Sequence, residues 1–356
     1  MRDAFVIVNP GARGGEGIDR QLRRRLPGAA VHRTVRPSHA RVLARRAALA
    51  GYPLVVAAGG DGTLNEVLNG IDPFLGQVRL GLLPLGTGND FARSVGIPDD
   101  LEGALAVLEQ GLVRRCDVVS FQDRRLRRLF LNVSAGGFSG EVGESLTAER
   151  KQRFGPLAYL RAAIDTIPER SDYRLTLRFD DHDEVHETAV NLVVANARYV
   201  AGGVPVAPDA MLDDGRFDVV LFRAASFASL AGLAPRVMLG RHLDDPGERI
   251  LFRRARSLEV RSVPHMPLNV DGELLGPRCG RFEVHAGALE MVVGEEAPAL
   301  APRSPEAGRL PEAPALPEAL QRPEAAGRVE LEEAGLRGWD GETGSRLPGT
   351  RSKTLP

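Results

Sequence analysis

The chain has 356 residues, which is long enough for two domains of ordinary size. Its 46 basic and 47 acidic residues nearly balance, which argues against a dedicated nucleic-acid binder because such proteins usually carry a basic excess. The sequence enters a predicted strand within four residues and no apolar stretch approaches the roughly 18 residues of a transmembrane helix, so we expect a soluble, cytoplasmic protein without a signal peptide.

The first 118 residues alternate short apolar runs with polar stretches of helical character. The apolar runs occupy residues 4–8, 30–34, 54–58 and 80–84, and the helical stretches occupy 18–26, 40–50, 64–69, 90–95 and 101–110. This alternation predicts a parallel sheet covered by helices, so we expect an α/β domain over residues 1–118.

From about residue 112 the pattern changes to closely spaced β-like runs. They lie at residues 113–121, 129–135, 173–179, 188–196, 216–222, 257–263, 266–270 and 281–293, with helices expected near 156–167 and 226–240. Strands at such short intervals predict a second domain, residues 119–295, that is mainly antiparallel.

The last part of the chain differs in composition. From Glu296 onward it holds 9 of the 25 prolines, and Pro-Glu recurs every six residues from Pro305 to Pro323. Proline lacks a backbone donor and fixes φ, so we expect residues 296–356 to form an extended, disordered tail without a packed core. The only tryptophan, Trp339, lies in this segment.

Two glycine-rich turns follow neighbouring predicted strands. Gly59-Gly60-Asp61-Gly62 follows the run at 54–58, and Gly86-Thr87-Gly88-Asn89-Asp90 follows the run at 80–84. Glycine lets backbone N–H groups approach a phosphate, and a helix that begins at such a turn adds its positive end. Ligands bind at the carboxyl ends of parallel strands. We therefore expect convergence of Asp61, Thr63, Thr87, Asn89 and Asp90.

Lysine is nearly absent from the chain. The only two lysines are Lys151 and Lys353, so the glycine-rich segment at 11–17 cannot be a P-loop, whose lysine contacts the terminal phosphates. Phosphate charge in the N-terminal half must instead be neutralised by a metal ion, helix ends or arginine.

Several motifs together resemble the diacylglycerol kinase catalytic family, which includes soluble bacterial lipid kinases and the sphingosine kinases. The motifs are Asn9-Pro10, the run from Gly59 to Glu66, the run from Leu85 to Ala92, Asp213-Asp214-Gly215, and the run from Asn269 to Glu273. Their order and spacing match the family over about residues 3 to 294.

The resemblance implies an ATP-dependent lipid kinase that converts diacylglycerol to phosphatidic acid. It also implies an active site in a cleft between the two domains, Mg²⁺ as a cofactor and a peripheral contact with the inner face of the membrane. A homodimer is left open, and neither nucleic acid nor a transmembrane segment is expected.

Site residues follow from the resemblance by position. The residues implied to contact ATP are Asn9, Pro10, Gly11, Ala12, Arg13, Thr34, Gly60, Asp61, Gly62, Thr63, Leu64, Asn65, Glu66 and Thr87. Asp61, Asp90 and Asp117 would surround the catalytic Mg²⁺. A structural Mg²⁺ would be held by Asp214 and by the backbone carbonyls of Met211 and Arg216, since oxygen ligands suit a hard cation.

Phosphoryl transfer to an alcohol also requires a carboxylate to take the hydroxyl proton. Asp271 and Glu273 flank Gly272 after a predicted strand, and either could serve. The resemblance favours Asp271 by position, whereas the spacing of the two carboxylates does not discriminate them. Two further segments are candidates for contact with the acceptor, residues 132–142, and with an anionic membrane surface, residues 151–159.

Other functions are compatible with parts of the pattern. A sphingoid base or another lipid alcohol could replace diacylglycerol as the acceptor. An NAD kinase shares the Gly-Gly-Asp-Gly turn, but the second turn, Leu85 to Phe91, fits the lipid kinases better. A catalytically silent nucleotide or lipid sensor would be expected to have lost at least one of Asp61, Asp90, Asp117 and Asp271.

Overall fold

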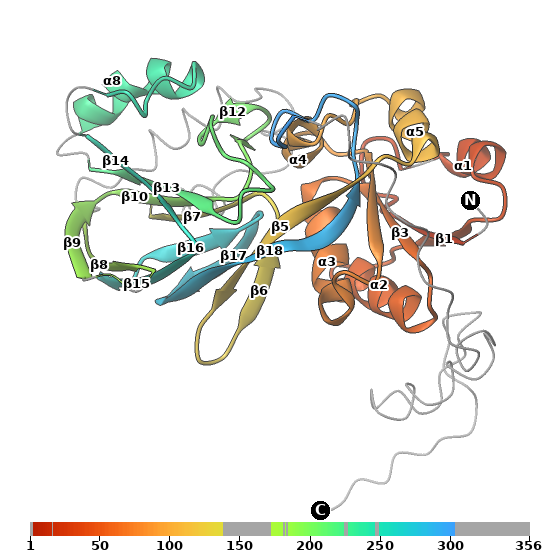
Figure 1. Cartoon of the computed structure of the whole chain (residues 1–356), viewed down its shortest axis with the longest axis horizontal. Coiled ribbons are helices and arrows are strands. Elements are labelled where there is room, and N and C mark those ends of the chain that lie inside the picture. Colours follow the sequence, from red (N-terminus) through yellow and green to blue (C-terminus); the bar gives the residue numbers. More distant parts are fainter. Residues whose placement is uncertain are drawn as a thin grey trace, which may run out of the picture. The chain divides into compact units, whose positions relative to one another are not determined.

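The computed structural model describes residues 3–15, 17–137, 172–180, 182, 184–223, 227–245 and 249–302 (Figure 1). The helix expected near 156–167, the basic and aromatic stretch at 151–159, and the Pro-Glu repeat lie outside the described residues. In the part that is described, no helix is both long and apolar enough to cross a membrane.

The N-terminal part contains parallel strands with helices between them, as predicted (Figure 1). The strands are β1 (Ala4–Val8), β2 (Ala30–Arg33), β3 (Leu54–Gly59) and β4 (Arg79–Pro84), in the order β2-β1-β3-β4. The helices are α1 (Asp19–Arg25), α2 (His39–Leu49), α3 (Asp61–Ile71), η1 (Asp72–Phe74, a 3₁₀ turn), α4 (Asp90–Ser94) and α5 (Leu101–Gln110). The central strands are continuous apolar runs because helices cover both of their faces.

The C-terminal part is antiparallel and forms a sandwich of two sheets. Its elements are β5 (Val113–Gln122), β6 (Arg127–Phe130), β7 (Val133–Gly137), β8 (Tyr173–Phe179), β9 (Glu184–Ala189), β10 (Asn191–Ala195), β11 (Tyr199–Val200), β12 (Val204–Pro205), β13 (Phe217–Phe222), α8 (Phe227–Met238), β14 (Ile250–Ala255), β15 (Ser257–Val263), β16 (Pro267–Val270), β17 (Glu273–Pro277) and β18 (Gly280–Val292). Among the described residues, one sheet has six strands in the order β14-β13-β10-β7-β16-β17.

The long strand β18 joins the two parts of the molecule. Glu290 and Met291 pair in parallel with β4 on one side, while β18 pairs in antiparallel fashion with β15 near its start and with β5 along its length. The N-terminal parallel strands and the second sheet of the sandwich are therefore continuous. Among the described residues they form one ten-stranded sheet that runs from β2 through β4 and β18 to β9. The pairing with β5 is irregular between His285 and Leu289.

Alternation along β10 shows how the sandwich is built. Leu192 and Val194 belong to the core between the two sheets, and Val193 and Ala195 belong to a second core on the opposite face. Successive side chains of a strand point to opposite faces, so a strand that is apolar throughout can serve both cores. Leu233 of α8 packs into the second core.

The structure differs from the sequence prediction at several boundaries. The predicted run at 129–135 is divided into β6 and β7, the run at 188–196 is divided at Val190, and β14 and β17 were not predicted. Core packing also extends beyond the predicted boundary at residue 296, since Ala299 and Leu300 are 0% and 5% exposed. The backbone N–H of Ala299 donates to the Ser94 carbonyl, which anchors this segment beside α4.

Candidate active site

The two glycine turns contact each other directly. They leave β3 and β4, which are adjacent and parallel, and Gly59 is in register with Pro84. A Cβ built on Gly86 would lie only 2.5 Å from the Cα of Gly60, so position 86 has no room for a side chain at this contact. The expected convergence of the two turns is therefore present in the structure.

Asp61 and Asp90 form the polar centre of this junction. The carboxylate of Asp61, the first residue of α3, accepts the backbone N–H groups of Asp90 and Phe91 at 3.2 Å each. The carboxylate of Asp90 accepts the N–H of Gly202 at 3.0 Å and a guanidinium N–H of Arg93 at 3.3 Å. Asp61 thus caps α4, and Asp90 connects α4 to the loop between β11 and β12.

A glycine keeps the space beside both carboxylates free. A Cβ on Gly88 would lie 3.4 Å from Oδ2 of Asp61 and 3.4 Å from Oδ2 of Asp90. The two oxygens therefore border one small volume that any other residue at position 88 would enter.

Burial raises the pKa values of both carboxylates. Burial raises the pKa of Asp61, and burial together with the negative charge of Asp61 raises the pKa of Asp90 to about 6. The N–H bonds described above act in the opposite direction in both cases. Two neighbouring carboxylates that are costly to ionise together are suited to a cation.

The other polar residues of the two turns, Thr63, Thr87 and Asn89, have different environments. Asn89 adopts a left-handed conformation (φ 49°), and its Oδ1 accepts the Gly86 N–H at 2.9 Å. Thr63 is buried and accepts an N–H of the Asn9 side chain at 3.2 Å. The side chain of Thr87 is exposed on the second turn.

The segment after β1 reaches the same junction through Asn9. Oδ1 of Asn9 accepts the Gly11 N–H at 3.0 Å, while its amide group holds Thr63. Arg13 is exposed, as are Pro10 and Gly11, and Ala12 is half-buried. Thr34 continues the edge strand, because its N–H donates to the Val8 carbonyl.

Two side chains in the set predicted to contact ATP are engaged elsewhere. Leu64 is 3% exposed and packs in the N-terminal core. The carboxylate of Glu66 accepts the N–H groups of Ser38 at 2.9 Å and Ala40 at 3.0 Å, so it caps α2. In this structure the Leu64 side chain has no access to a nucleotide, and Glu66 supports the loop before α2.

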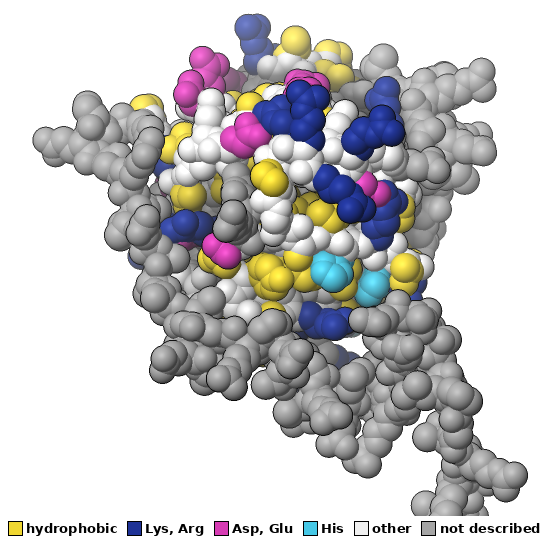
Figure 2. All heavy atoms as spheres, turned by 90° about the vertical axis from the view of Figure 1, so that its right-hand side faces the viewer, with side chains coloured by type: hydrophobic (Ala, Val, Ile, Leu, Met, Phe, Trp, Pro, Cys, Tyr) yellow, Lys and Arg dark blue, Asp and Glu magenta, His cyan; other side chains and the backbone are white. Residues whose placement is uncertain are grey.

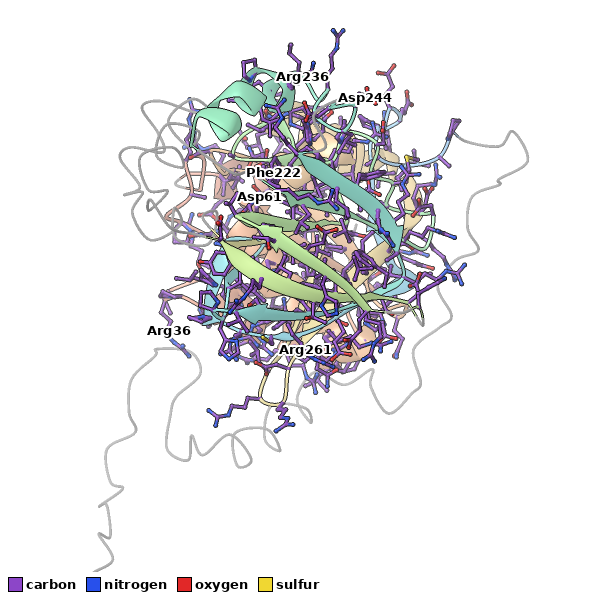
Figure 3. All side chains as sticks on the ribbon, turned by 90° about the vertical axis from the view of Figure 1, so that its left-hand side faces the viewer. Arg36, Asp61, Phe222, Arg236, Asp244 and Arg261 are labelled. Atoms are coloured by element: carbon purple, nitrogen blue, oxygen red, sulfur yellow. The ribbon has the colours of Figure 1, made fainter. Side chains whose placement is uncertain are left out.

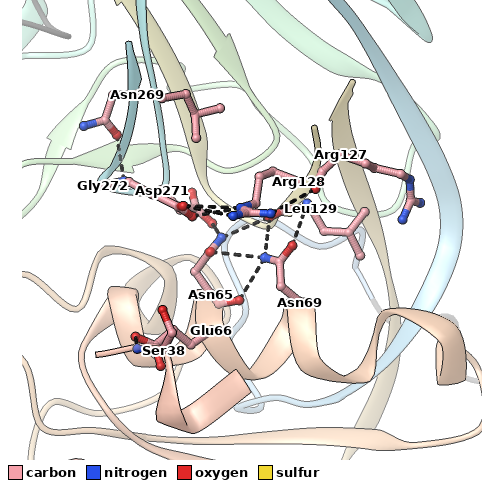
Figure 4. A network of polar contacts seen from close by, with 12 residues as sticks. Ser38, Asn65, Glu66, Asn69, Arg127, Arg128, Leu129, Asn269, Asp271 and Gly272 are labelled. Atoms are coloured by element: carbon pink, nitrogen blue, oxygen red, sulfur yellow. Dashed lines mark hydrogen bonds and ion pairs between the residues drawn. The ribbon is translucent and has the colours of Figure 1, made fainter. Parts of the chain in front are cut away.

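Asp271 is held by the backbone between β6 and β7 (Figure 4). Its Oδ1 accepts the N–H groups of Asn132 and Val133 at 3.1 and 2.9 Å. Its Oδ2 accepts the N–H of Leu131 at 3.0 Å and the side-chain amide of Asn65, on α3, at 3.1 Å. The break between the two strands releases these N–H groups from the sheet and turns them toward the carboxylate.

The environment of Asp271 is unusual for a carboxylate in a turn. The residue has a left-handed backbone (φ 44°), and burial, with a contribution from the charge of Asp61, raises its pKa to about 6. Glu273 differs, since its side chain is 47% exposed and forms an ion pair with Arg128 at 3.1 Å. Of the two candidates, only Asp271 is hydrogen-bonded to α3.

Asp117 makes its contacts at a different turn. Its carboxylate accepts the N–H groups of Gly215 and Gly287, each at 2.7 Å, and burial raises its pKa. Asp117 therefore supports the turn at 211–216, and its oxygens contact neither Asp61 nor Asp90.

The predicted structural metal site lies at this same turn. Asp213 accepts a guanidinium N–H of Arg114 and the N–H of Ala301, each at 3.0 Å, whereas Oδ1 of Asp214 accepts only the nearby N–H of Arg216 at 3.0 Å. A polar pocket of about 950 Å³ is lined by both aspartates. Within the described residues, no three His, Cys, Asp or Glu side chains are grouped as metal ligands.

Residues 199–203 were not predicted to belong to the site. Ala201, Gly202 and Gly203 all have positive φ (55°, 83° and 115°), and this conformation directs the Gly202 N–H at Asp90. The carbonyl of Tyr199 accepts the side-chain amide of Asn132 at 2.9 Å. The adjacent glycines were the only sequence signal for this loop.

Comparison with known proteins identifies both parts of the chain. Residues 3–121 match the family model described as diacylglycerol kinase catalytic domain, and residues 132–293 match the model described as YegS C-terminal NAD kinase beta sandwich-like domain.

Curated relatives extend over most of the chain. A diacylglycerol kinase of Staphylococcus haemolyticus is 32% identical over 252 residues, which cover 71% of this chain and 74% of that protein. A diacylglycerol kinase of Bacillus subtilis is 31% identical over 290 residues, which cover 79% and 93% respectively.

Two crystal structures from Bacillus anthracis str. Sterne share the fold, each covering 82% of this chain and 97% of its own. One has a TM-score of 0.71 at 24% identity, and the other, of a diacylglycerol kinase, has 0.63 at 21%. The two family models, the curated relatives and the shared architecture together show that this chain belongs to the diacylglycerol kinase family.

Proposed function

We propose that this chain transfers the γ-phosphoryl group of ATP to a lipid hydroxyl, with diacylglycerol as the acceptor and phosphatidic acid as the product. In this proposal residues 1–118 bind ATP and residues 119–295 bind the lipid. The names of the relatives, diacylglycerol kinases, support the acceptor, and the site geometry supports the chemistry.

The junction of the two turns fits a polyphosphate. Helix α3 is 11 residues long, and the residue before it, Gly60, has no side chain to cap it, so N–H groups of its first turn are available to an anion. Gly88 leaves space beside them, and Asn9 fixes the segment at 9–11 against Thr63. Arg13 is the exposed cation nearest in sequence to this segment and would replace the missing lysine.

Asp61 and Asp90 also fit a magnesium ion. Mg²⁺ is usually bound by one or two carboxylates together with substrate phosphates, and these two oxygens border the same small volume. When bound, Mg-ATP would supply the transferable phosphoryl group and neutralise its charge. The protein would contribute fixed carboxylates and helix N-terminal N–H groups, which need no rearrangement during the reaction.

Asp271 would take the proton of the acceptor hydroxyl. With a pKa of about 6 it is ionised at neutral pH and still basic enough to accept a proton. Its oxygens already accept two N–H groups each, which occupies the roughly four acceptor positions of a carboxylate. One donor must give way, and the Asn65 amide can do so by side-chain rotation, whereas the other three are backbone groups.

The observation that carries the proposal is the position of Asn65 and Asp61 on one helix. Asp61 begins α3 at the glycine turns, and Asn65, one turn later, donates to Asp271 at 3.1 Å. The phosphate-binding turns and the proposed proton acceptor are therefore linked through a single rigid element.

The direct test is a phosphorylation assay. Purified protein would be incubated with labelled ATP, Mg²⁺ and either diacylglycerol in non-ionic micelles or a mixed lipid extract, and the labelled products would be identified. We expect labelled phosphatidic acid. If only a sphingoid base were labelled, the acceptor would be a sphingoid base and not diacylglycerol. The absence of any labelled lipid would refute the kinase assignment.

A further inference from the structure

The basic residues of the N-terminal part are unevenly distributed. Between Asp19 and Asp61 the chain has nine arginines and no acidic residue, although its overall net charge is only −1. This stretch forms α1, β2 and α2, and Figure 1 shows both helices on its right-hand side, α1 above and α2 below β1. Figure 2 looks onto that side and shows basic side chains with apolar atoms between them.

Several of these arginines are exposed and have no acidic partner. Arg25 pairs with Glu102 and Glu109, and Arg33 pairs with Asp19. In the described part of the chain, no ion pair is formed by the exposed residues Arg20, Arg23, Arg24, Arg36, Arg41 and Arg46. The side chain of Arg36 projects away from the body of the protein (Figure 3).

Exposed apolar side chains occur in the same stretch. Val35 is 78% exposed and Val42 is 44% exposed, and they are two of five large hydrophobic residues that are exposed in the described ranges. Val42 lies on the outer side of α2 beside Arg41, and Arg46 follows it by one helical turn. We call Val35, Arg36, Arg41, Val42 and Arg46 the basic face.

The basic face is linked to the proposed acceptor site through α3. Glu66 holds the loop before α2 through the N–H groups of Ser38 and Ala40, at 2.9 and 3.0 Å. Asn65, the preceding residue of α3, donates to Asp271 (Figure 4). The loop that carries Val35 and Arg36 is thus fixed to the same helix turn that contacts the proposed proton acceptor.

We propose that the basic face docks on an anionic lipid bilayer, with its arginines on the lipid phosphates and its two valines among the headgroups. The proposal rests on the proposed function, because a kinase acting on a membrane lipid must bring its acceptor site to the bilayer. Unpaired cations are complementary to an anionic surface, and exposed valines gain from a lipid interface. They gain nothing from the phosphate backbone of a nucleic acid, so a membrane is favoured.

Binding can be measured without the reaction. Full-length protein would be sedimented, in the absence of ATP, with vesicles of phosphatidylcholine alone or mixed equally with phosphatidylglycerol. We expect binding to the anionic vesicles that weakens with salt. The triple variant Arg36→Gln, Arg41→Gln, Arg46→Gln should bind them at least tenfold more weakly, and Val35→Ser with Val42→Ser should weaken the binding that remains at high salt.

A matched variant controls for net charge. It is a second triple variant, which removes three exposed arginines outside the basic face: Arg124→Gln, Arg125→Gln, Arg256→Gln. We expect it to bind vesicles as the wild-type protein does. Equal losses of vesicle binding in both triple variants would refute a specific docking face. So would wild-type protein that does not bind anionic vesicles, or that binds a DNA duplex instead.

Activity separates this inference from the proposed function. On short-chain diacylglycerol in non-ionic micelles the basic-face variant should equal wild type, and on anionic vesicles it should lose about as much activity as binding. Vesicle binding without phosphorylation of any lipid would refute the kinase and leave docking supported. Phosphorylation in micelles without vesicle binding would refute the docking.

Discussion

At the residue scale, the position of Asp271 distinguishes it from Glu273. Asp271 is half-buried and accepts N–H groups of the backbone, whereas Glu273 is half-exposed and paired with Arg128. We expect Asp271→Asn to lower kcat by about 10² to 10⁴, the usual scale for a lost general base, with ATP affinity unchanged. Asparagine tolerates the left-handed backbone at this position, so the melting temperature should hold.

The matched control is Glu273→Gln, which we expect to retain activity within about threefold because it removes only an exposed ion pair. Steady-state kinetics and ATP titration of both variants test this assignment. If Glu273→Gln lost more activity than Asp271→Asn, the proton acceptor would be Glu273.

Asn65 should tune the pH dependence of the reaction. A base must be deprotonated, so activity should fall as the pH drops through about 6, the pKa of Asp271. The Asn65 amide stabilises the carboxylate and thereby lowers that pKa. Because the Asn65 bond is present before the acceptor binds, Asn65→Ala should move the acidic limb of the kcat/KM profile, which reports the free enzyme, to higher pH. A limb that stays in place or moves down would exclude this role.

Asp61 should be indispensable although it is structurally replaceable. Asp61→Asn removes one of two buried like charges, which offsets the loss of one N–H bond from the start of α4. We expect activity to fall by about 10² or more, the scale for a lost preorganised charge, while the melting temperature changes little. Asp99→Asn, on a nearby carboxylate that is 62% exposed, should be nearly silent. Turnover close to wild type in Asp61→Asn would remove Asp61 from the site.

At the element scale, the turn at 211–216 contains two aspartates with different contacts. Asp213 ties β5 to the segment after β18 through Arg114 and Ala301, so Asp213→Ala should cost about 1 to 3 kcal/mol whether or not Mg²⁺ is present. Asp214→Ala should have little effect in a chelator but should abolish the stabilisation gained from Mg²⁺. Thermal melts with Mg²⁺ and with chelator test both variants, and an undiminished Mg²⁺ response in Asp214→Ala would exclude it as a ligand.

Elements with a single clear pattern could be predicted from the sequence. Four elements have the predicted bounds: β1, β8, β15 and α5. Apolar runs or alternation define the three strands, and Asp100 caps α5. β14 and β17 mix charged and apolar residues without a regular period, so no strand was predicted there.

The partners of the site residues could not be predicted in the same way. Glu66 reaches Ser38 because α3 lies beside the loop before α2, and Asp271 reaches Leu131 because the turn after β16 lies beside the break between β6 and β7. The motifs single out candidate carboxylates, but which N–H groups hold them depends on backbone geometry far away in the chain.

At the scale of the whole molecule, the packed body ends later than the motifs do. Ala299 and Leu300 are buried, and the N–H of Leu212 donates to the Ala299 carbonyl at 2.7 Å. Truncation after Pro302 should leave melting temperature and micellar activity unchanged, because the remaining sequence is rich in proline and poor in apolar residues.

Truncation after Glu295 should instead cost about 2 to 5 kcal/mol, comparable to losing a buried leucine. Melting curves of the two truncated proteins compare the effects directly. Equal stability of both would mean that residues 296–302 contribute nothing to the fold, and a loss in both would assign a structural role to the tail.

The pairing of β18 with β4 also determines the order in which the protein can be completed during synthesis. The edge of β4 is covered by Glu290 and Met291, which leave the ribosome long after β4 itself. Until then the apolar strand β4 is paired with β3 on one side and has one unpaired edge, a template for pairing with another chain. We therefore expect the nascent chain to be most prone to aggregation between synthesis of β4 and synthesis of β18, because β18 covers the free edge of the sheet formed by β1 to β4.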